Sequence, residues 1–416
     1  MPSKPIERYL ERYAASAAMA KAGMARAATA RIETTHKRYR QALIVPAFDE
    51  DDKPLRVLAE QCRNTRTLFI LVINCPENAD PAARERTRQL LRTVRTDAAF
   101  ADVCWFDAVS TPLPRREGVG LARKLGTDLA LDLYNRRILS SPWFFQTDAD
   151  ATLPRGYFET ALPEHASAVV FAHEHVSSDS RLLRAARLYE QHMHYYVAGL
   201  RFAGSSYAYP TLGSTIAVNA TAYAMVRGYP RRNAGEDFHL LNKLNKISRV
   251  VHMPQITVRL AARLSHRVPF GTGPALADIS QTLATDDSGE AYLSYHPQVF
   301  CMLRRTLAAL HAYEREGIDS FHPQDAEILH RLGWSRVRAA FRLGRSGAVH
   351  EWFDGLKSLR FVHEASHIIP RVSLLETLQG KNGLFFKTER DTGILQVSEH
   401  SHEYSRDKRL FTSDNV

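Results

Sequence analysis

The sequence lacks the features that would assign it to a membrane, secreted or zinc-binding class. Only four of its 416 residues are cysteine, namely Cys62, Cys75, Cys104 and Cys301, and no two form a CxxC pair. A zinc knuckle and a disulfide framework are therefore not expected. No apolar run approaches the ~20 residues of a membrane helix, and the first residues contain no apolar signal-peptide core. We expect a cytoplasmic protein.

Negative charge is scarce relative to positive charge. The chain has 55 Lys and Arg against 45 Asp and Glu, a net charge of +10, and residues 1–40 supply nine of the basic side chains. Such a balance indicates anionic partners. Nucleic acid is not expected, because no RNA-recognition motif, zinc finger or helix-turn-helix is present. We predict that residues 1–38 form a basic helical arm packed on the main domain; peripheral contact with the inner face of a membrane is the alternative.

Apolar runs alternate with helical segments through the first half of the chain. Strands are predicted at 43–45, 68–74, 103–106 and 143–145, with helices at 55–63, 81–95 and 119–135 between them. Further strands are predicted at 168–172, 213–219 and 249–253, and a long helix at 181–200. This alternation favours an α/β fold with a mostly parallel sheet flanked by helices. We predict a catalytic domain over 39–275, a helical C-terminal region over 276–385 and a polar tail over 386–416.

Two carboxylates end the fourth predicted strand. Asp148 and Asp150 follow the buried run at 143–145, with Ala149 between them, and Pro154 is predicted to open a helix. Ligands of open α/β sheets bind beyond the carboxyl ends of the strands. Two acids there suit Mg2+ or Mn2+ that also binds phosphate oxygens. The alternative is a solvated turn, which Asp also favours.

The segment 118–126 contains two glycines at a predicted helix start. It is no dinucleotide loop, because Arg123 stands where the third glycine of GxGxxG would be, and the segment follows the third strand rather than the first. Glycines at a helix N-terminus can leave N–H groups free for an anion. We therefore expect Arg123 and Lys124 to reach a phosphate; a solvated basic helix face is the alternative.

Two later stretches carry further charged candidates. Glu236 and Asp237 fall in the first turn of a predicted helix, where acids are also common as partners of the helix dipole. Arg263, His266 and Arg267 lie beside a Gly/Pro-rich loop, which predicts a diphosphate clamp or else a solvated basic turn.

Taken together and in order, these motifs resemble those of family 2 glycosyltransferases of the GT-A fold. The resemblance covers roughly residues 40–275. Residues 44–50 resemble the opening strand of that family, Asn74 sits where its second strand ends, and 118–126 is similar to the segment before its DXD motif. Thr147–Asp150 resembles the DXD motif itself, and Gly235–Asp237 its later ED motif.

The resemblance implies a metal-dependent hexosyltransferase that moves a sugar from a UDP- or GDP-sugar to an unknown hydroxyl acceptor. It implies Mn2+ or Mg2+ held by Asp148, Asp150 and His266, and an inverting reaction with Asp237 as base, beside Glu236. The implied donor contacts are Pro46, Phe48, Glu50, Asn74, Arg123, Lys124, Asp148, Arg263 and Arg267.

The chain also departs from the family. Asn74-Cys-Pro-Glu77 replaces the usual Asn-Asp-Gly-Ser, so uracil specificity stays open, and the QxxRW motif of processive synthases is missing. Residues 263–267 are similar to a segment of retaining GT-A enzymes, which makes a retaining reaction one alternative. A GT-A-like nucleotidyltransferase is another, although no Gly-rich loop follows the first strand. A non-catalytic scaffold would need neither metal nor nucleotide.

Overall fold

The computed structural model describes residues 3–14, 37–264, 271–338, 341 and 347–381, together with the backbone of two strands at 384–388 and 395–399. Two predicted site residues, His266 and Arg267, and most of the predicted arm lie outside these ranges. The chain forms two compact units, one of Met1–Tyr189 with Tyr209–Asp278 and one of Glu190–Ala208 with Ile279–Val416. The division predicted from the sequence stays a prediction.

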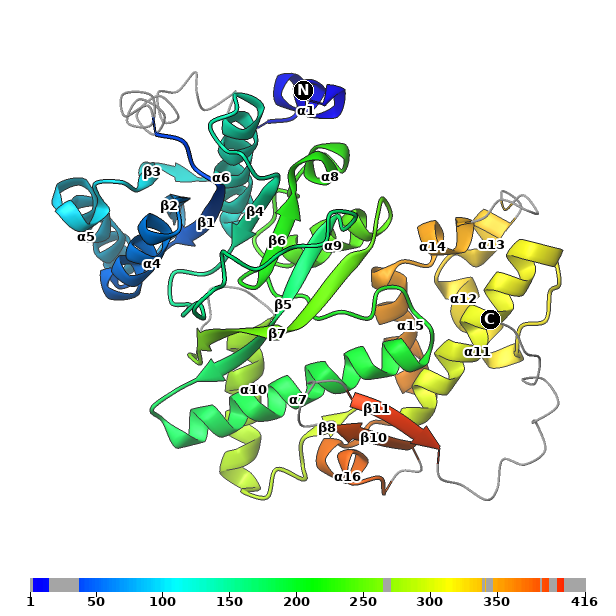
Figure 1. The fold of residues 1–416 in the computed structure, drawn as a ribbon. Helices are drawn as coiled ribbons and strands as arrows, with labels where there is room; N and C mark the ends of the chain where they lie inside the picture. The colour runs from blue at the N-terminus through cyan, green and yellow to red at the C-terminus, as the bar shows by residue number, and fades with distance from the viewer. Residues whose placement is uncertain are drawn as a thin grey trace. The chain divides into compact units, whose positions relative to one another are not determined.

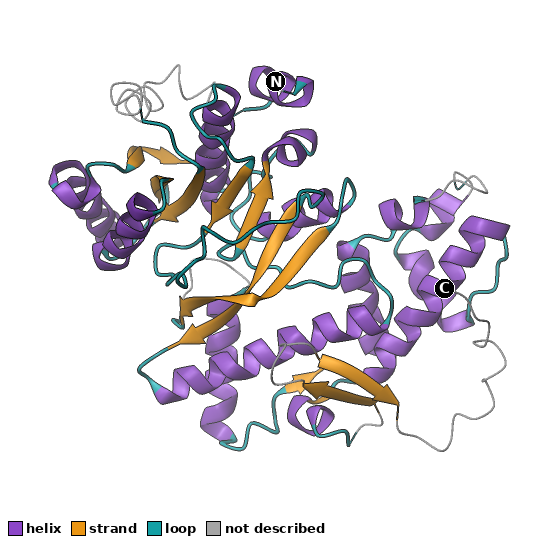
Figure 2. Ribbon diagram, in the orientation of Figure 1, coloured by secondary structure: helices purple, strands orange, loops and turns teal. Residues whose placement is uncertain are grey.

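The first unit contains a seven-stranded sheet with the strand order β3-β2-β1-β4-β6-β5-β7 (Figures 1 and 2). β1, β2, β3 and β4 run parallel, β5 and β7 are parallel to each other, and β6 is antiparallel to its neighbours β4 and β5. The predicted α/β class with a mostly parallel sheet is confirmed. The strands are β1 (Gln41–Ala47), β2 (Thr67–Pro76), β3 (Cys104–Leu113), β4 (Trp143–Gln146), β5 (Ala168–Val176), β6 (Ile216–Asn219) and β7 (Val250–Ala261).

Helices cover both faces of the sheet because successive strand side chains point to opposite sides. Leu43 and Phe69 lie in the core that α4 (Asp52–Asn64) and α5 (Pro81–Thr96) complete. On the other face, Gly126 of α6 (Gly118–Asn135) lies so close to Ile44 and Val72 that a Cβ there would come within 2.5 Å of Ile44. The small residue lets α6 rest directly on the strands. A short 3-10 turn, η1, spans Ala98–Phe100.

The remaining elements of this part of the chain largely follow the predicted pattern. The long helix is α7 (Ser180–Phe202), and α8 (Ala220–Met225), α9 (Glu236–Asn245) and α10 (Thr272–Thr285) follow. The helix predicted to open at Pro154 is wrong, because residues 155–159 form turns. Tyr157 and Phe158 pack instead on Phe145 of β4, and such long-range aromatic contacts outweigh a local helix signal.

The second unit is mainly helical. Gly199 of α7 lies against the ring of Phe300, where a Cβ would come within 2.4 Å of the ring atoms, so a larger residue would force the ring to move. Its elements are β8 (Leu293–Ser294), α11 (Pro297–Glu316), α12 (Pro323–Arg331), α13 (Trp334–Val337), α14 (Ala348–Trp352), α15 (Gly355–Ile368), β9 (Val372–Ser373) and α16 (Leu374–Leu378). β10 (Leu384–Thr388) and β11 (Leu395–Glu399) pair as an antiparallel hairpin. No helix among the described residues combines the length and apolar character needed to cross a membrane.

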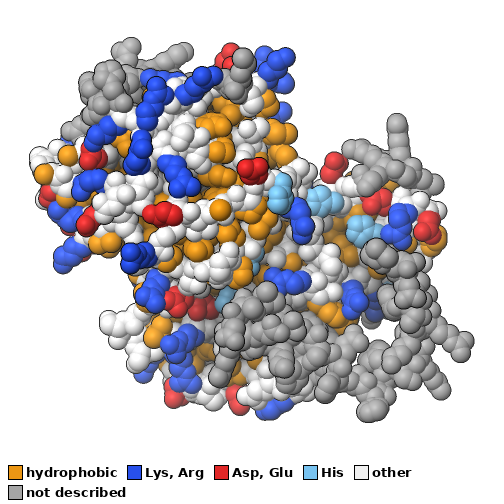
Figure 3. All heavy atoms as spheres, viewed as in Figure 1, with side chains coloured by type: hydrophobic (Ala, Val, Ile, Leu, Met, Phe, Trp, Pro, Cys, Tyr) orange, Lys and Arg blue, Asp and Glu red, His pale blue; other side chains and the backbone are white. Residues whose placement is uncertain are grey.

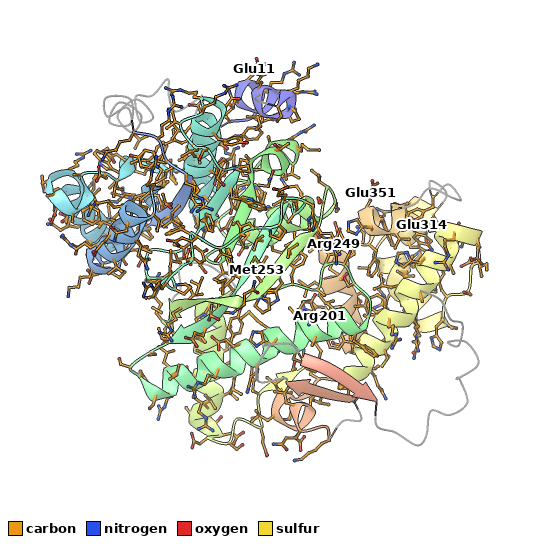
Figure 4. All side chains as sticks on the ribbon, viewed as in Figure 1. Glu11, Arg201, Arg249, Met253, Glu314 and Glu351 are labelled. Atoms are coloured by element: carbon orange, nitrogen blue, oxygen red, sulfur yellow. The ribbon has the colours of Figure 1, made fainter. Side chains whose placement is uncertain are left out.

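The described part of the arm is a helix, α1 (Lys4–Arg12), that packs on α6 and α8. Glu11, labelled in Figure 4, lies on its exposed side, whereas Tyr9 is fully buried. The Tyr9 hydroxyl donates to Asp128 Oδ1 at 2.6 Å and accepts from Lys124 Nζ, while Tyr223 donates to the same Asp128 oxygen at 2.9 Å. This network ties the N-terminal helix to α6.

Replacing Tyr9 by Phe should therefore destabilise the first unit. The change removes one hydrogen bond to a buried carboxylate, which typically contributes about 1.5–3 kcal/mol. Tyr13→Phe, one turn further along, should shift the unfolding midpoint far less, because Tyr13 contacts Arg227 through its ring. Thermal unfolding of both variants tests this. Equal midpoints would show that the buried network adds no stability.

Candidate active site

Three parallel strands, β2, β1 and β4, end side by side, and the segments after them form the wall of a cavity of about 780 Å3. A volume in this range is typical of small-molecule sites. Six residues predicted to bind a donor lie in that wall: Pro46, Phe48, Glu50, Asn74, Asp148 and Arg263. Among the described residues, the wall does not include Arg123, Lys124, Asp150, Glu236 or Asp237.

The loop that carries the two aspartates is fixed at both ends. The Thr147 N–H donates to the carbonyl of Ile44 on β1 at 3.2 Å. Thr152 and Arg259 of β7 exchange two backbone hydrogen bonds, at 2.8 and 3.0 Å. Asp148 and Asp150 are therefore held between two strands of the sheet, which is the placement that a ligand site beyond β4 requires.

Asp148 is bound by a buried arginine. Arg123 Nη2 donates to Asp148 Oδ1 at 2.6 Å, and Nε of the same side chain donates to Glu236 Oε1 at 3.1 Å. The Arg123 side chain is only 3% exposed, whereas that of Asp148 is 43% exposed. Burial alone would lower the pKa of Arg123, but Asp148 and other nearby acids raise it. Arg123 thus joins the end of β4 to the first turn of α9.

Asp150 has an arginine partner of its own. Arg263 Nε lies 3.2 Å from Asp150 Oδ2, and its two Nη atoms donate to the carboxylate of Glu50 at 2.8 and 2.7 Å. Burial raises the pKa of Asp150 to about 6, although Arg263 acts in the opposite direction. The negative charges of Asp148 and Glu50 add to the increase.

Glu236 and Asp237 differ in their surroundings although they are adjacent. Gly235 precedes α9 in a left-handed conformation (φ 68°), which glycine adopts without strain. Glu236 is buried against Arg123, and burial and the Asp237 carboxylate raise its pKa. Asp237 is half-buried and accepts from the Phe238 N–H at 2.7 Å, and burial raises its pKa also. Of the two, Asp237 is the more open to a reactant.

At the start of α6, neither the Gly120 N–H nor Lys124 is placed as an anion site would need. The Gly120 N–H donates to the carbonyl of Arg232 at 3.0 Å, so it is not free for a phosphate. Lys124 is buried and bonded to Tyr9 and Asp128 instead of facing the cavity. Arg123 and Lys124 are adjacent in sequence but have different partners. Arg123 binds Asp148, whereas Lys124 binds Tyr9 of α1.

Sequence reasoning missed two arginines of the cavity wall, Arg86 and Arg115. Arg86 forms a two-point ion pair with Asp49, at 2.6 and 3.0 Å. Arg115 follows the end of β3, the next parallel strand along the same edge. The strand-end rule that identified Asp148 would have found Arg115 as well; Arg86 lies within α5 and gave no comparable signal.

Comparisons with known proteins add little to this geometry. No protein-family model matches the chain, and no curated protein matches it. Among solved structures, the chain is similar to the mannosyltransferase PcManGT from Pyrobaculum calidifontis in complex with GDP-Man and Mn2+. That likeness covers 86% of this chain and 99% of that one, at 15% identity and a TM-score of 0.32. A likeness of this size decides neither fold nor activity.

The raised pKa of Asp150 predicts how stability depends on pH. In unfolded chains Asp titrates near 3.9, so between about pH 4 and 6 only the folded state keeps the proton, and stability falls as the pH rises. Asp150→Asn removes this titration. The stability of the variant relative to wild type should increase by roughly 2 kcal/mol from pH 4 to pH 7.

Unfolding of both proteins at several pH values measures that difference. Glu164→Gln, which changes an exposed carboxylate, is the control and should show a difference independent of pH. A flat difference for Asp150→Asn as well would mean that the folded state does not disfavour the Asp150 charge.

Proposed function

We propose that this protein is a metal-dependent glycosyltransferase that moves a sugar from a nucleotide-sugar to an acceptor hydroxyl. The observation that carries the proposal is the pair Asp148 and Asp150, fixed beyond the carboxyl end of β4, beside a cavity large enough for a nucleotide. The ordered motifs that resemble family 2 glycosyltransferases of the GT-A fold support the same activity. Each aspartate already has an arginine partner at hydrogen-bond or ion-pair distance.

The charges of the site fit a divalent cation. Two guanidinium groups, Arg123 and Arg263, are shared among four carboxylates, those of Glu50, Asp148, Asp150 and Glu236. The group therefore carries two uncompensated negative charges when all four acids are ionised. Asp148 and Asp150 would hold Mn2+ or Mg2+ through their oxygens, the ligand type that both ions accept. When bound, the ion would supply positive charge that stabilises the departing diphosphate.

The residues that line the cavity support one direction for the donor. The cavity wall joins Asp148 and Arg263 to Phe48 and Asn74 at the ends of β1 and β2. We place the diphosphate near Asp148 and Arg263, and the nucleoside along Phe48 and Asn74. The Asn74 side chain is buried, and its Oδ1 has no hydrogen-bond partner among the described residues, so it can accept a hydrogen bond from a base.

In the transfer step, the acceptor oxygen forms a bond to the anomeric carbon while the bond from that carbon to the phosphate oxygen breaks. The acceptor proton needs a base, and the nucleoside diphosphate leaves with the bonding electrons. Asp237 would take the proton in an inverting reaction, provided that the acceptor comes within hydrogen-bond reach. The raised pKa of Asp237 makes it a stronger base than an exposed aspartate.

Donor binding should require the metal. UDP-, GDP- and dTDP-sugars are added in Mn2+ or in EDTA, and the thermal midpoint is followed, because a bound ligand raises stability by mass action. We expect an upward shift for one base class, in Mn2+ only. Asp150→Asn should abolish the shift, and Glu164→Gln should retain it. Equal shifts in EDTA and Mn2+ would refute the metal site, and conversion of the nucleotide-sugar with added pyrophosphate into a nucleoside triphosphate and a sugar 1-phosphate would indicate a nucleotidyltransferase.

Asp237→Asn tests the inverting reaction. The amide keeps the size of the side chain but cannot take the acceptor proton, so transfer should slow by roughly 100-fold or more. Donor binding should be unchanged, because Asp237 lies outside the cavity wall. Transfer rate and donor affinity are measured on one preparation. Normal transfer with normal binding would remove Asp237 from the mechanism and favour a retaining reaction, in which the leaving phosphate can accept the proton.

A further inference from the structure

A second hollow opens at the opposite edge of the sheet. It has a volume of about 370 Å3 and lies where β1, β2 and β3 begin, beside Tyr39, Thr67 and Val103. The parallel strands place all three beginnings at one edge and the proposed donor site at the other. The seven residues of β1 separate the two edges by roughly 20 Å. A ligand in this hollow would not overlap the donor.

The rim of the hollow is strongly basic. Four cationic side chains line it, Lys37, Arg38, Arg63 and Arg66, and the one acidic side chain among the lining residues is Asp102. Asp102 accepts from Lys37 Nζ at 2.7 Å and from Arg63 Nε at 3.3 Å. Arg38 and Arg66 are exposed and contact only backbone carbonyls in the described structure. Figure 3 shows Lys and Arg side chains gathered over this region of β1, β3 and α6.

The rim is held in place by backbone contacts. The Tyr39 N–H donates to the carbonyl of Ile138 at 3.0 Å, and the Arg40 N–H donates to that of Arg66 at 2.9 Å. The segment before β1 and the turn before β2 are therefore joined. Because the backbone positions are fixed, less conformational entropy is lost when the arginine side chains bind an anion.

The floor of the hollow is apolar. Ala59, Cys62, Phe69 and Val103 line it and are all nearly fully buried, and Tyr39 adds an aromatic side chain. Guanidinium groups match the oxygens of a phosphate in two-point contacts. A basic rim around an apolar floor therefore suits a phosphate that is attached to an apolar or aromatic group.

We propose that this hollow binds a phosphate monoester with an apolar or aromatic body, with Arg38 and Arg66 as the principal phosphate ligands. The site is independent of the glycosyltransferase proposal. The ligand could be a soluble organic phosphate or the head group of an acidic lipid, and the two sources share the same chemistry.

Phenyl phosphate is the soluble probe, and calorimetric titration of the full chain in EDTA measures its binding. We expect saturable binding at one site, weaker for inorganic phosphate, which lacks the ring. The double variant Arg38→Gln/Arg66→Gln should reduce the affinity by about 10-fold or more. Asp102→Asn removes the one carboxylate of the rim and should increase the affinity by roughly 3- to 10-fold at low salt.

The gain in Asp102→Asn is the sharpest outcome, because structural damage would not tighten binding. Arg92→Gln, which changes an exposed arginine of α5 outside both hollows, should bind like wild type. Loss of binding in Arg263→Gln, with retention in the double variant, would place the anion in the donor cavity and overturn the proposal. Equal affinity for inorganic phosphate would overturn the role of the apolar floor.

The lipid source is tested by co-sedimentation with phosphatidylcholine vesicles, with and without phosphatidic acid. Binding that requires phosphatidic acid and is lost in the double variant supports the site with a lipid ligand, even if phenyl phosphate binds weakly. Absence of saturable binding to both probes would refute the site.

Discussion

The site depends on the buried guanidinium of Arg123. A charge that is nearly removed from water is tolerated only when it is paired and hydrogen-bonded. Arg123 meets this condition by binding Asp148 and Glu236, which lie 88 residues apart in the chain but adjacent in the fold. Loss of one partner would leave an uncompensated buried charge, which is strongly destabilising. The ends of β4 and the start of α9 are therefore constrained to meet at this side chain.

The constraint extends through α6 to the N-terminus. The Arg123 carbonyl accepts from the Thr127 hydroxyl, which in turn accepts from Gln146 of β4. One residue further along, Lys124 lies on a different side of α6, where it meets Tyr9 of α1. Helix α6 is thus held on one side by the strand that carries the aspartates and on the other by α1. The N-terminal helix belongs to the packing of the first unit, whatever further role the basic arm has.

Local patterns predicted the features that depend on neighbouring residues. The alternation of apolar strands with helices gave the sheet, and the strand-end position gave Asp148 and Asp150. The same patterns failed where contacts with residues distant in the sequence determine how a side chain is placed. The sequence around Lys124 suggests a surface lysine, but its side chain binds Tyr9, which lies 115 positions away. The glycines at 118 and 120 look like a phosphate loop, but they allow the backbone at Arg232 and Asn233 to approach closely. Neither partner is visible in a local pattern.

The two arginines of the site are not equivalent, and the difference bears on how it could accept a metal. The Arg123 side chain is 3% exposed and that of Arg263 is 39% exposed. A buried, doubly paired guanidinium cannot leave its carboxylates without a large loss of pairing energy. A guanidinium that water can partly reach, as at Arg263, loses less when it changes partners. Asp150 can therefore give up Arg263 for a cation more easily than Asp148 can give up Arg123. The Asp148 carboxylate is therefore fixed by Arg123, whereas the Asp150 carboxylate can change its partner. When a cation enters, the change in pairing would occur at Asp150.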